Sequence, residues 1–301
     1  MGINVNFSTF HPEPFPMKRL DDVIARPLLA VIACSAFAGL LLIAVFILKE
    51  GLPFMLHVGL PNFLGASEWQ PDEGRFGIFP MIVASLWVTL GAMAIGAPLG
   101  VAGAIFLCEF VPRPVMRAVK PAIELLAGIP SVVFGFLGVM VLAPLIRGHL
   151  GGPGLSLLAA VIILGIMVLP TVTSISIDAI IAVPNAFREG ALALGATRWQ
   201  AVHMVILKAA RSGIIASIIL AMGRAVGETM AVIMVAGNTV RVPHSALDPV
   251  CTLTAKIAME MASATGLHRQ SLFAIGVVLF VVIMILNALA IAAIRPRRGA
   301  A

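Results

Sequence analysis

Six long apolar runs constrain this chain more than any other feature of its sequence. A helix needs about 20 mostly apolar residues to cross a hydrocarbon core roughly 30 Å thick. Ordinary soluble domains contain about 25% charged residues, whereas this chain of 301 residues contains 11%. That composition excludes a soluble enzyme and a soluble nucleic-acid-binding domain. We predict an all-α polytopic membrane protein with six transmembrane helices, at residues 27–48, 79–106, 121–146, 155–177, 212–236 and 271–294.

The basic residues divide unevenly between the two sides of such a bundle. If successive helices alternate in direction, most Lys and Arg residues fall in the tail 1–26, in the loops 107–120 and 178–211, and after residue 294. Cytoplasmic loops of membrane proteins carry the excess of Lys and Arg. We therefore expect both termini to be cytoplasmic, with residues 1–26 as an N-terminal tail. The net charge of +6 reflects this bias, and we expect no nucleic-acid partner.

Proline and glycine interrupt several of the apolar runs. Pro98, Pro130 and Pro170 each lie inside a run, and Gly96 and Gly100 flank the first of them. Kinked or unwound backbone inside a membrane is tolerated only where neighbouring helices or a cavity satisfy the freed carbonyl groups. These positions indicate a packed bundle with an internal path, rather than six helices that simply face lipid.

Residue patterns that hold metals or nucleotides are missing from the sequence. Its three cysteines, Cys34, Cys108 and Cys251, form no CxxC pair, and its six histidines are scattered without metal-ligand spacing. The chain also lacks a P-loop motif for the phosphates of ATP. We expect no metal site, no cofactor and no enzymatic activity in this chain.

The predicted cytoplasmic loop at residues 185–208 has an unusual pattern. Residues 187–194 favour a short helix, Gly195 permits a turn, and a second helix follows. In that second helix the apolar residues share one face at helical spacing, namely Trp199, Val202, Val205 and Ile206. Such a helix–glycine–helix element suits a groove on another protein, but it also suits an amphipathic connector that packs under its own bundle.

Two opposite charges lie inside the fifth apolar run. Arg224 at the bilayer centre costs roughly 2.5–3.5 kcal/mol on insertion scales, so it should face the bundle interior. The i,i+4 spacing lets Arg224 and Glu228 meet on one helix face. They form either an ion pair that fixes helix packing, or a site where Arg224 binds a passing oxyanion and Glu228 holds Arg224 when the path is empty. Glu124, in the third run, either complements a helix N-terminus or lines the inner gate, and we favour the first.

The 185–208 loop resembles the EAA loop of bacterial ABC importer permeases. Glu189, Ala191, Gly195 and Leu207 match that pattern in register, while Gly190 and Val205 replace its Ala and Ile, and Lys208 replaces its Pro. The resemblance implies that this segment docks into a separate ATPase subunit, which hydrolyses ATP and drives the membrane helices. The coupling residues it implies are Glu189, Gly190, Ala191, Gly195, Val205 and Leu207.

Three further stretches resemble the phosphate-specific permeases, in particular their PstC branch. They are Phe63–Gly77, Pro121–Gly135 and the fifth-run composite Gly223–Val232. The resemblance implies a type I importer permease fold and a role as one permease subunit of an ATP-driven phosphate importer in the bacterial inner membrane. It places Arg224 and Glu228 on the substrate path. The partners it implies are a sister permease, an ATPase dimer and an extracytoplasmic phosphate-binding protein.

Two alternatives stay open from the sequence. An ABC permease for another oxyanion, such as sulfate or molybdate, would share the coupling loop. An anion transporter that works without an ATPase would be favoured by an inverted internal repeat of the helices, and the sequence shows none.

Overall fold

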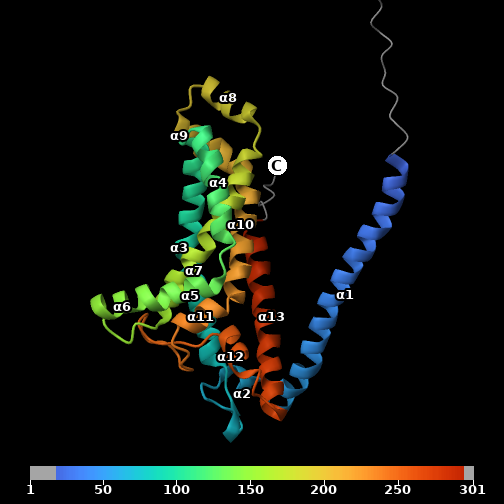
Figure 1. The fold of residues 1–301 in the computed structure, drawn as a ribbon, viewed down its shortest axis with the longest axis vertical. Coiled ribbons are helices and arrows are strands. Elements are labelled where there is room, and N and C mark those ends of the chain that lie inside the picture. Colours follow the sequence, from blue (N-terminus) through green and yellow to red (C-terminus); the bar gives the residue numbers. More distant parts are fainter. Residues whose placement is uncertain (1–17, 295–301) are drawn as a thin grey trace, which may run out of the picture. The chain divides into compact units, whose positions relative to one another are not determined.

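The structure of this chain is a computed structural model that describes residues 18–294 (Figure 1). Residues 1–17 of the predicted N-terminal tail and the whole C-terminal basic segment lie outside the described residues, whereas residues 18–26 of that tail are helical. The chain divides into two units, one ending at Lys49 and the other starting at Glu50. Within residues 18–294, six helical stretches are long and apolar enough to cross a membrane, which confirms the predicted fold class. They are Arg26–Val58, Phe79–Glu109, Ser131–His149, Leu157–Ile181, Arg198–Gly227 and Gly266–Leu289.

Helix α1 (Lys18–Val58) contains the first predicted span and continues beyond it. Its apolar side chains between residues 28 and 48 are mostly exposed within this chain. From Glu50 onward α1 belongs to the second unit, where Phe54 packs edge-on against Phe63 and Phe76, with ring centroids 5.8 and 5.0 Å apart. Phe54 therefore attaches two connecting elements, helix α2 (Leu60–Gly65) and the hairpin that follows it, to the end of α1.

A small hairpin was not predicted from the sequence. Strands β1 (Trp69–Gln70) and β2 (Arg75–Phe76) pair antiparallel, with Trp69 opposite Phe76. The 3-10 turn η1 (Pro71–Glu73) joins them and ends at Gly74, whose φ of +73° suits a residue without a side chain. The hairpin lies at the end of the bundle that also holds α2 and α12 (Figure 1).

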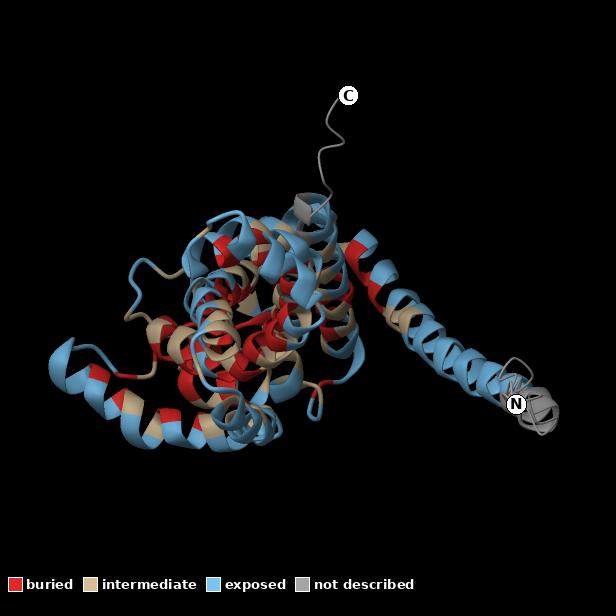
Figure 2. Ribbon diagram, turned by 90° about the horizontal axis from the view of Figure 1, so that it is seen from above, coloured by how far each residue is buried: buried red, intermediate tan, exposed pale blue. Residues whose placement is uncertain are grey.

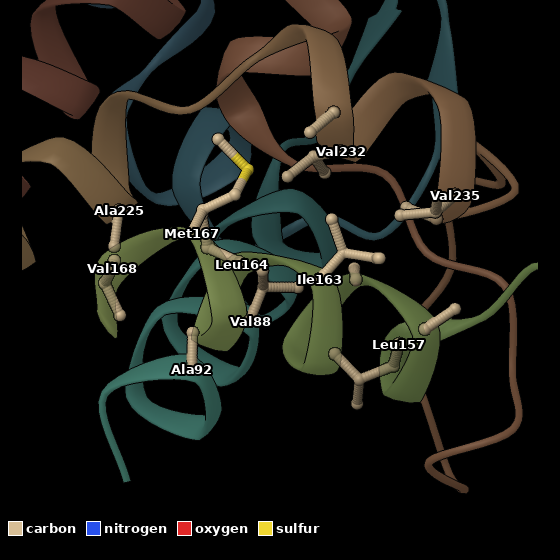
Figure 3. Close-up of a cluster of buried hydrophobic side chains, with 14 of the residues drawn as sticks. Val88, Ala92, Leu157, Ile163, Leu164, Met167, Val168, Ala225, Val232 and Val235 are labelled. Carbon is tan, nitrogen blue, oxygen red and sulfur yellow. The ribbon is translucent and has the colours of Figure 1, made fainter. Parts of the chain in front are cut away.

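The core of the second unit forms between helices α3 (Phe79–Glu109), α7 (Leu157–Ile181) and α10 (Leu207–Gly227). Buried positions gather on the faces that these helices turn toward one another (Figure 2). Close to the centre, Val88 and Ala92 of α3 lie beside Leu164 and Val168 of α7 (Figure 3). Glycine permits this approach, because a Cβ on Gly96 would lie 2.3 Å from a methyl group of Val168.

The predicted third span is wrong as a single helix. The chain forms α4 (Arg113–Ala127), breaks at residues 128–130, and restarts as the helical stretch Ser131–His149. That stretch contains α5 (Ser131–Leu137), the π-helical turn η2 (Gly138–Leu142) and α6 (Ala143–His149), and it runs across the bundle axis (Figure 1). Proline disfavours helical backbone in the residue before it, so Pro130 sets the break. Glu124 consequently lies in the last turn of α4, and the expected helix N-terminus beside it is absent.

The predicted fifth span is also interrupted. Helix α10 continues directly from α9 (Arg198–Ala201) and the π-helical turn η3 (Val202–Ile206), but it ends at Gly227. Glu228 has extended backbone angles, and α11 (Met230–Val235) starts two residues later. Glycine at the last position lowers the helix propensity where the chain leaves the helix.

The two ends of the bundle carry different elements (Figure 1). Helix α8 (Asn185–Ala193) and α9 lie at one end. At the other end lie the hairpin, α12 (Leu253–Glu260) and the start of α13 (Gly266–Ile294). Helix α13 contains the predicted sixth span and begins several residues before it.

The α3–α7 contact predicts a difference between two glycines of α3. Gly96→Ala should lower the free energy of unfolding by about 1–3 kcal/mol, because the new methyl group overlaps Val168 in a packed interface. Gly103→Ala is the matched control, since its Cβ would lie at an ordinary 3.8 Å from Thr173. Unfolding of the purified protein in detergent measures both, and equal stability of the two variants would contradict this packing.

Candidate functional site

Arg224 lies in the last turn of α10 and binds the end of another helix. Its Nη1 and Nη2 donate to the carbonyl oxygen of Ala127 at 3.4 and 3.3 Å, and Nη1 also donates to Oγ1 of Thr171 at 3.3 Å. Ala127 is the last residue of α4. The final carbonyls of a helix lack intrahelical donors and carry partial negative charge. The broken third span thus supplies the acceptor that compensates this cation.

The predicted i,i+4 contact between Arg224 and Glu228 is wrong. Glu228 lies beyond the end of α10, and its Oε1 accepts from the backbone N–H groups of Thr229 at 3.2 Å and Ala231 at 3.3 Å. Its carboxylate therefore satisfies free donors at the start of α11. Among residues 18–294, no ion pair joins Arg224 to Glu228. The prediction failed because it required a continuous helix through Gly227.

An open pocket of about 390 Å³ lies beside the guanidinium. Thr171 of α7, Gly223 and Arg224 of α10, and Asn287 of α13 line it, together with two apolar residues of α10. Glu228 is not among its lining residues. Arg224 is only partly buried, so a small anion in this pocket could reach its donors. The site combines a permanent cation with a neutral amide and a hydroxyl, which suits an oxyanion.

The loop at the α8 end places the sequence-predicted coupling residues at a helix–turn–helix. Glu189 and Gly190 are exposed on α8, whereas Ala191 is buried against the bundle. Gly195 has φ +84° and forms the turn that any other residue would strain. Thr197 then caps α9, with its Oγ1 accepting from the N–H of Gln200 at 3.3 Å.

The shared apolar face expected after the turn is only partly correct. Val202 and Ile206 are buried, and Val205 and Leu207 are half-buried. Trp199 remains 59% exposed and stacks on His203, with centroids 6.3 Å apart. The π-helical turn at residues 202–206 changes the rotation per residue, so Trp199 does not follow the buried face.

An ion pair missed by sequence reasoning joins α8 to the end of α3. Arg188 donates from Nη2 to Oε1 of Glu109 at 2.5 Å and from Nε to Oε2 at 3.2 Å. The Glu109 side chain is only 8% exposed, so this two-point contact fixes α8 against the bundle. The two residues are far apart in the sequence, and no motif links them.

Comparisons with known proteins identify the family. The family described as "Binding-protein-dependent transport system inner membrane component" matches residues 96–299. The chain belongs to this family. It is therefore a multi-pass membrane permease subunit of an ABC importer, and the family is a transport component rather than a catalytic enzyme.

The relatives of this permease carry two kinds of name. It is 41% identical to "Probable ABC transporter permease protein YqgH" of Bacillus subtilis, over 88% of each chain. It is 39% identical to "Phosphate transport system permease protein PstC" of Mesorhizobium japonicum, over 76% of each chain. These similarities confirm the resemblance to the PstC branch.

Solved structures support the fold of this permease. A chain of a bacterial alginate ABC transporter, solved with an alginate-bound periplasmic protein, superposes with a TM-score of 0.61 at 16% identity. The match covers 92% of this permease and 97% of that chain. The similarity confirms the type I permease architecture.

The Arg188–Glu109 contact predicts how firmly α8 is held. Arg188→Gln leaves a buried carboxylate without its cation, so α8 should open more readily. We expect amide hydrogen exchange in residues 185–194 to accelerate about tenfold, which corresponds to about 1.4 kcal/mol. Arg198→Gln is the control, because Arg198 is exposed at the start of α9. Unchanged exchange in Arg188→Gln would show that the ion pair does not hold the helix.

Proposed function

We propose that this permease is one of two membrane subunits of an ATP-driven importer that moves inorganic phosphate into the cytoplasm. The observation that carries the proposal is the Arg224 guanidinium, held on the last carbonyl of α4 beside an open pocket. The PstC-named relatives support phosphate as the cargo. An expected extracytoplasmic binding protein would impose most of the selectivity.

Arg224 is suited to bind its cargo transiently. Its bonds to Ala127 are 3.3–3.4 Å long, and both converge on one neutral oxygen. Charge-assisted bonds to an oxyanion are shorter, at about 2.7–2.9 Å, and the guanidinium can form two in parallel. A phosphate in the pocket can therefore replace the Ala127 carbonyl as the acceptor for Arg224. Arg224 can donate to the carbonyl again when phosphate leaves. We also assign Glu228, four residues after Arg224, to the substrate path, where its carboxylate fixes the start of α11.

The α8–α9 element couples this permease to its ATPase. Glu189 and Gly190 are available on the exposed side of α8, and Leu194 beside Gly195 is 91% exposed. Ala191, Val205 and Leu207 anchor the same element to the bundle. Binding of an ATPase dimer to this surface would transmit its closure to α3 through Arg188 and Glu109, and to α10 through η3.

The proposal also covers orientation, membrane and partners. The α8 end faces the cytoplasm with both chain termini, and the end with the hairpin and α12 faces outward to the phosphate-binding protein. The membrane is the bacterial inner membrane, and a sister permease completes the channel as a heterodimer. Sulfate or molybdate is the alternative cargo, because the site recognises an oxyanion through donors that those anions also accept.

Arg224→Gln should abolish phosphate uptake by the assembled importer, reducing its rate by more than about tenfold, because an amide offers neither the charge nor the paired donors. Arg211→Gln is the control, since Arg211 lies exposed near the start of the same helix. Uptake of labelled phosphate into proteoliposomes, with excess sulfate as competitor, is the measurement. If Arg224→Gln takes up phosphate at the wild-type rate, Arg224 serves only helix packing. Strong competition by sulfate would favour the alternative cargo.

Gly195→Pro should uncouple ATP hydrolysis from uptake. Proline holds φ near −65°, whereas Gly195 has φ +84°, so the substitution forces the loop into another conformation. The control is Gly148→Ala, because a Cβ there meets nothing within 4 Å and the residue lies in α6, outside the α8–α9 element. We expect insertion and assembly to persist in both variants, with phosphate transported per ATP falling several-fold only in Gly195→Pro. Normal coupling in that variant would remove this loop from the mechanism.

A further inference from the structure

A line of polar side chains follows the contact between α4 and α7 toward the α8 end. On α4 it consists of Lys120, Glu124 and the carbonyl of Ala127, and on α7 of Asp178, Ser174 and Thr171. Each set is spaced three or four residues apart, so each lies on one helix face. We call these six residues the α4–α7 seam. The spacing places Lys120 about 10 Å along α4 from the carbonyl that binds Arg224.

The two sides of the seam are bonded at each level. Next to Arg224 and Thr171, Oγ of Ser174 donates to Oε1 of Glu124 at 3.5 Å. One turn further, Nζ of Lys120 donates to Oδ1 of Asp178 and lies 3.7 Å from Oε1 of Glu124. Lys120 is therefore a second cation after Arg224, and the carboxylates of Asp178 and Glu124 contact it.

The seam is open to its surroundings even though it runs beside apolar helices. The side chain of Glu124 is 51% exposed and that of Asp178 is 59% exposed. Ionised side chains at membrane depth face a bundle interior or a water-filled cavity, because exposure to lipid is costly. The exposed side of the seam therefore faces water or the expected sister permease, not acyl chains.

The seam continues into a basic pocket at the α8 end of the bundle. This pocket, of about 270 Å³, includes Arg113 and Arg117 of α4, Ile181 of α7, and Asn185 and Arg188 of α8. Arg117 precedes Lys120 by one turn, and Ile181 follows Asp178 by one turn. Arg113 and Arg117 are exposed. Basic side chains therefore recur from Arg224 to the predicted cytoplasmic surface, with the carboxylates Glu124 and Asp178 beside Lys120.

We propose that the α4–α7 seam lines the cytoplasmic half of the anion path, with Lys120 as a second binding station after Arg224. This inference rests on the proposed function. An anion that leaves Arg224 meets Lys120, and its negative charge competes with Asp178 and Glu124 for the ammonium group. The carboxylates restore their contacts to Lys120 when the anion moves on to Arg117 and Arg113. Each station holds the anion weakly enough to release it.

Cysteine labelling tests whether the seam is an aqueous path, independently of the cargo. In the assembled complex, with Cys34, Cys108 and Cys251 replaced by serine, Ser174→Cys should react with a charged methanethiosulfonate added from the cytoplasmic side. Ala102→Cys is the matched control, because it lies equally far from the end of its helix, on an exposed apolar strip with Leu99 and Phe106. Ser174→Cys should react at least about tenfold faster than Ala102→Cys, and equal rates would overturn the proposal.

A second measurement isolates the charge of Lys120. At Ser174→Cys we expect an anionic reagent to react faster relative to a cationic one while Lys120 is present. Lys120→Gln should lower this ratio by about threefold or more, and Lys120→Arg should preserve it, because the local potential depends on the charge. Arg211→Gln should leave the ratio unchanged. If Lys120→Gln leaves this ratio unchanged, Lys120 is not a binding station for the anion.

Uptake connects the station to transport. Lys120→Gln should reduce the maximal rate of phosphate uptake by about tenfold, which is about 1.4 kcal/mol. The half-saturating phosphate concentration should stay unchanged, because the binding protein sets it. Lys120→Arg should restore the rate, and a rate equal to wild type in Lys120→Gln would contradict the inference. If the assembled wild-type complex imports no phosphate while Ser174→Cys still reacts, the proposed function fails and the aqueous seam stands.

Discussion

The structure depends on how one arginine is satisfied within a membrane-spanning helix. Arg224 carries a positive charge, and a charge within a membrane-spanning helix is costly. The chain compensates it with a helix end, because α4 stops at Ala127 and presents its last carbonyl to the guanidinium. An acidic partner would have held the cation more tightly. A neutral carbonyl leaves the positive charge available, which a binding site for a travelling anion requires.

Two breaks in the helices make this arrangement possible, and each has a local cause. Pro130 ends the helical backbone before α5, and Gly227 is the last helical residue before Glu228 and α11. The resulting helices α5 and α11 pack against each other across the bundle, where Gly135 leaves room for Met234. Unwound backbone at these points lies beside other helices and an open pocket, the only surroundings in which a membrane tolerates it. The two helix breaks and the bonding of Arg224 to the end of α4 therefore belong to one structural arrangement.

Hydropathy predicted much of this fold, because six apolar runs need no tertiary information. Hydropathy alone did not place the breaks: Pro130 indicated kinked or unwound backbone inside the third run, but not that the helix stops at Ala127 and restarts in another direction. The acceptor for Arg224 was beyond prediction, because a backbone carbonyl distant in sequence carries no residue signature. The predicted contact of Glu228 with Arg224 failed for a related reason. Residues at i,i+4 spacing meet only within a continuous helix, and α10 ends before Glu228. Sequence reasoning missed the stripe Thr171, Ser174 and Asp178, although its members lie three and four residues apart, and it missed the pair Lys120 and Glu124 as well.

The polar faces also indicate how the chain must be covered in a membrane. Glu124 and Asp178 are exposed on the α4–α7 seam, while α3 exposes the apolar strip of Leu99, Ala102 and Phe106. Only the second of these surfaces is compatible with acyl chains. The seam therefore needs water or another polypeptide against it, and a single permease provides neither on that side. Another polypeptide on that side would cover the two exposed carboxylates, which would destabilise an isolated subunit in lipid.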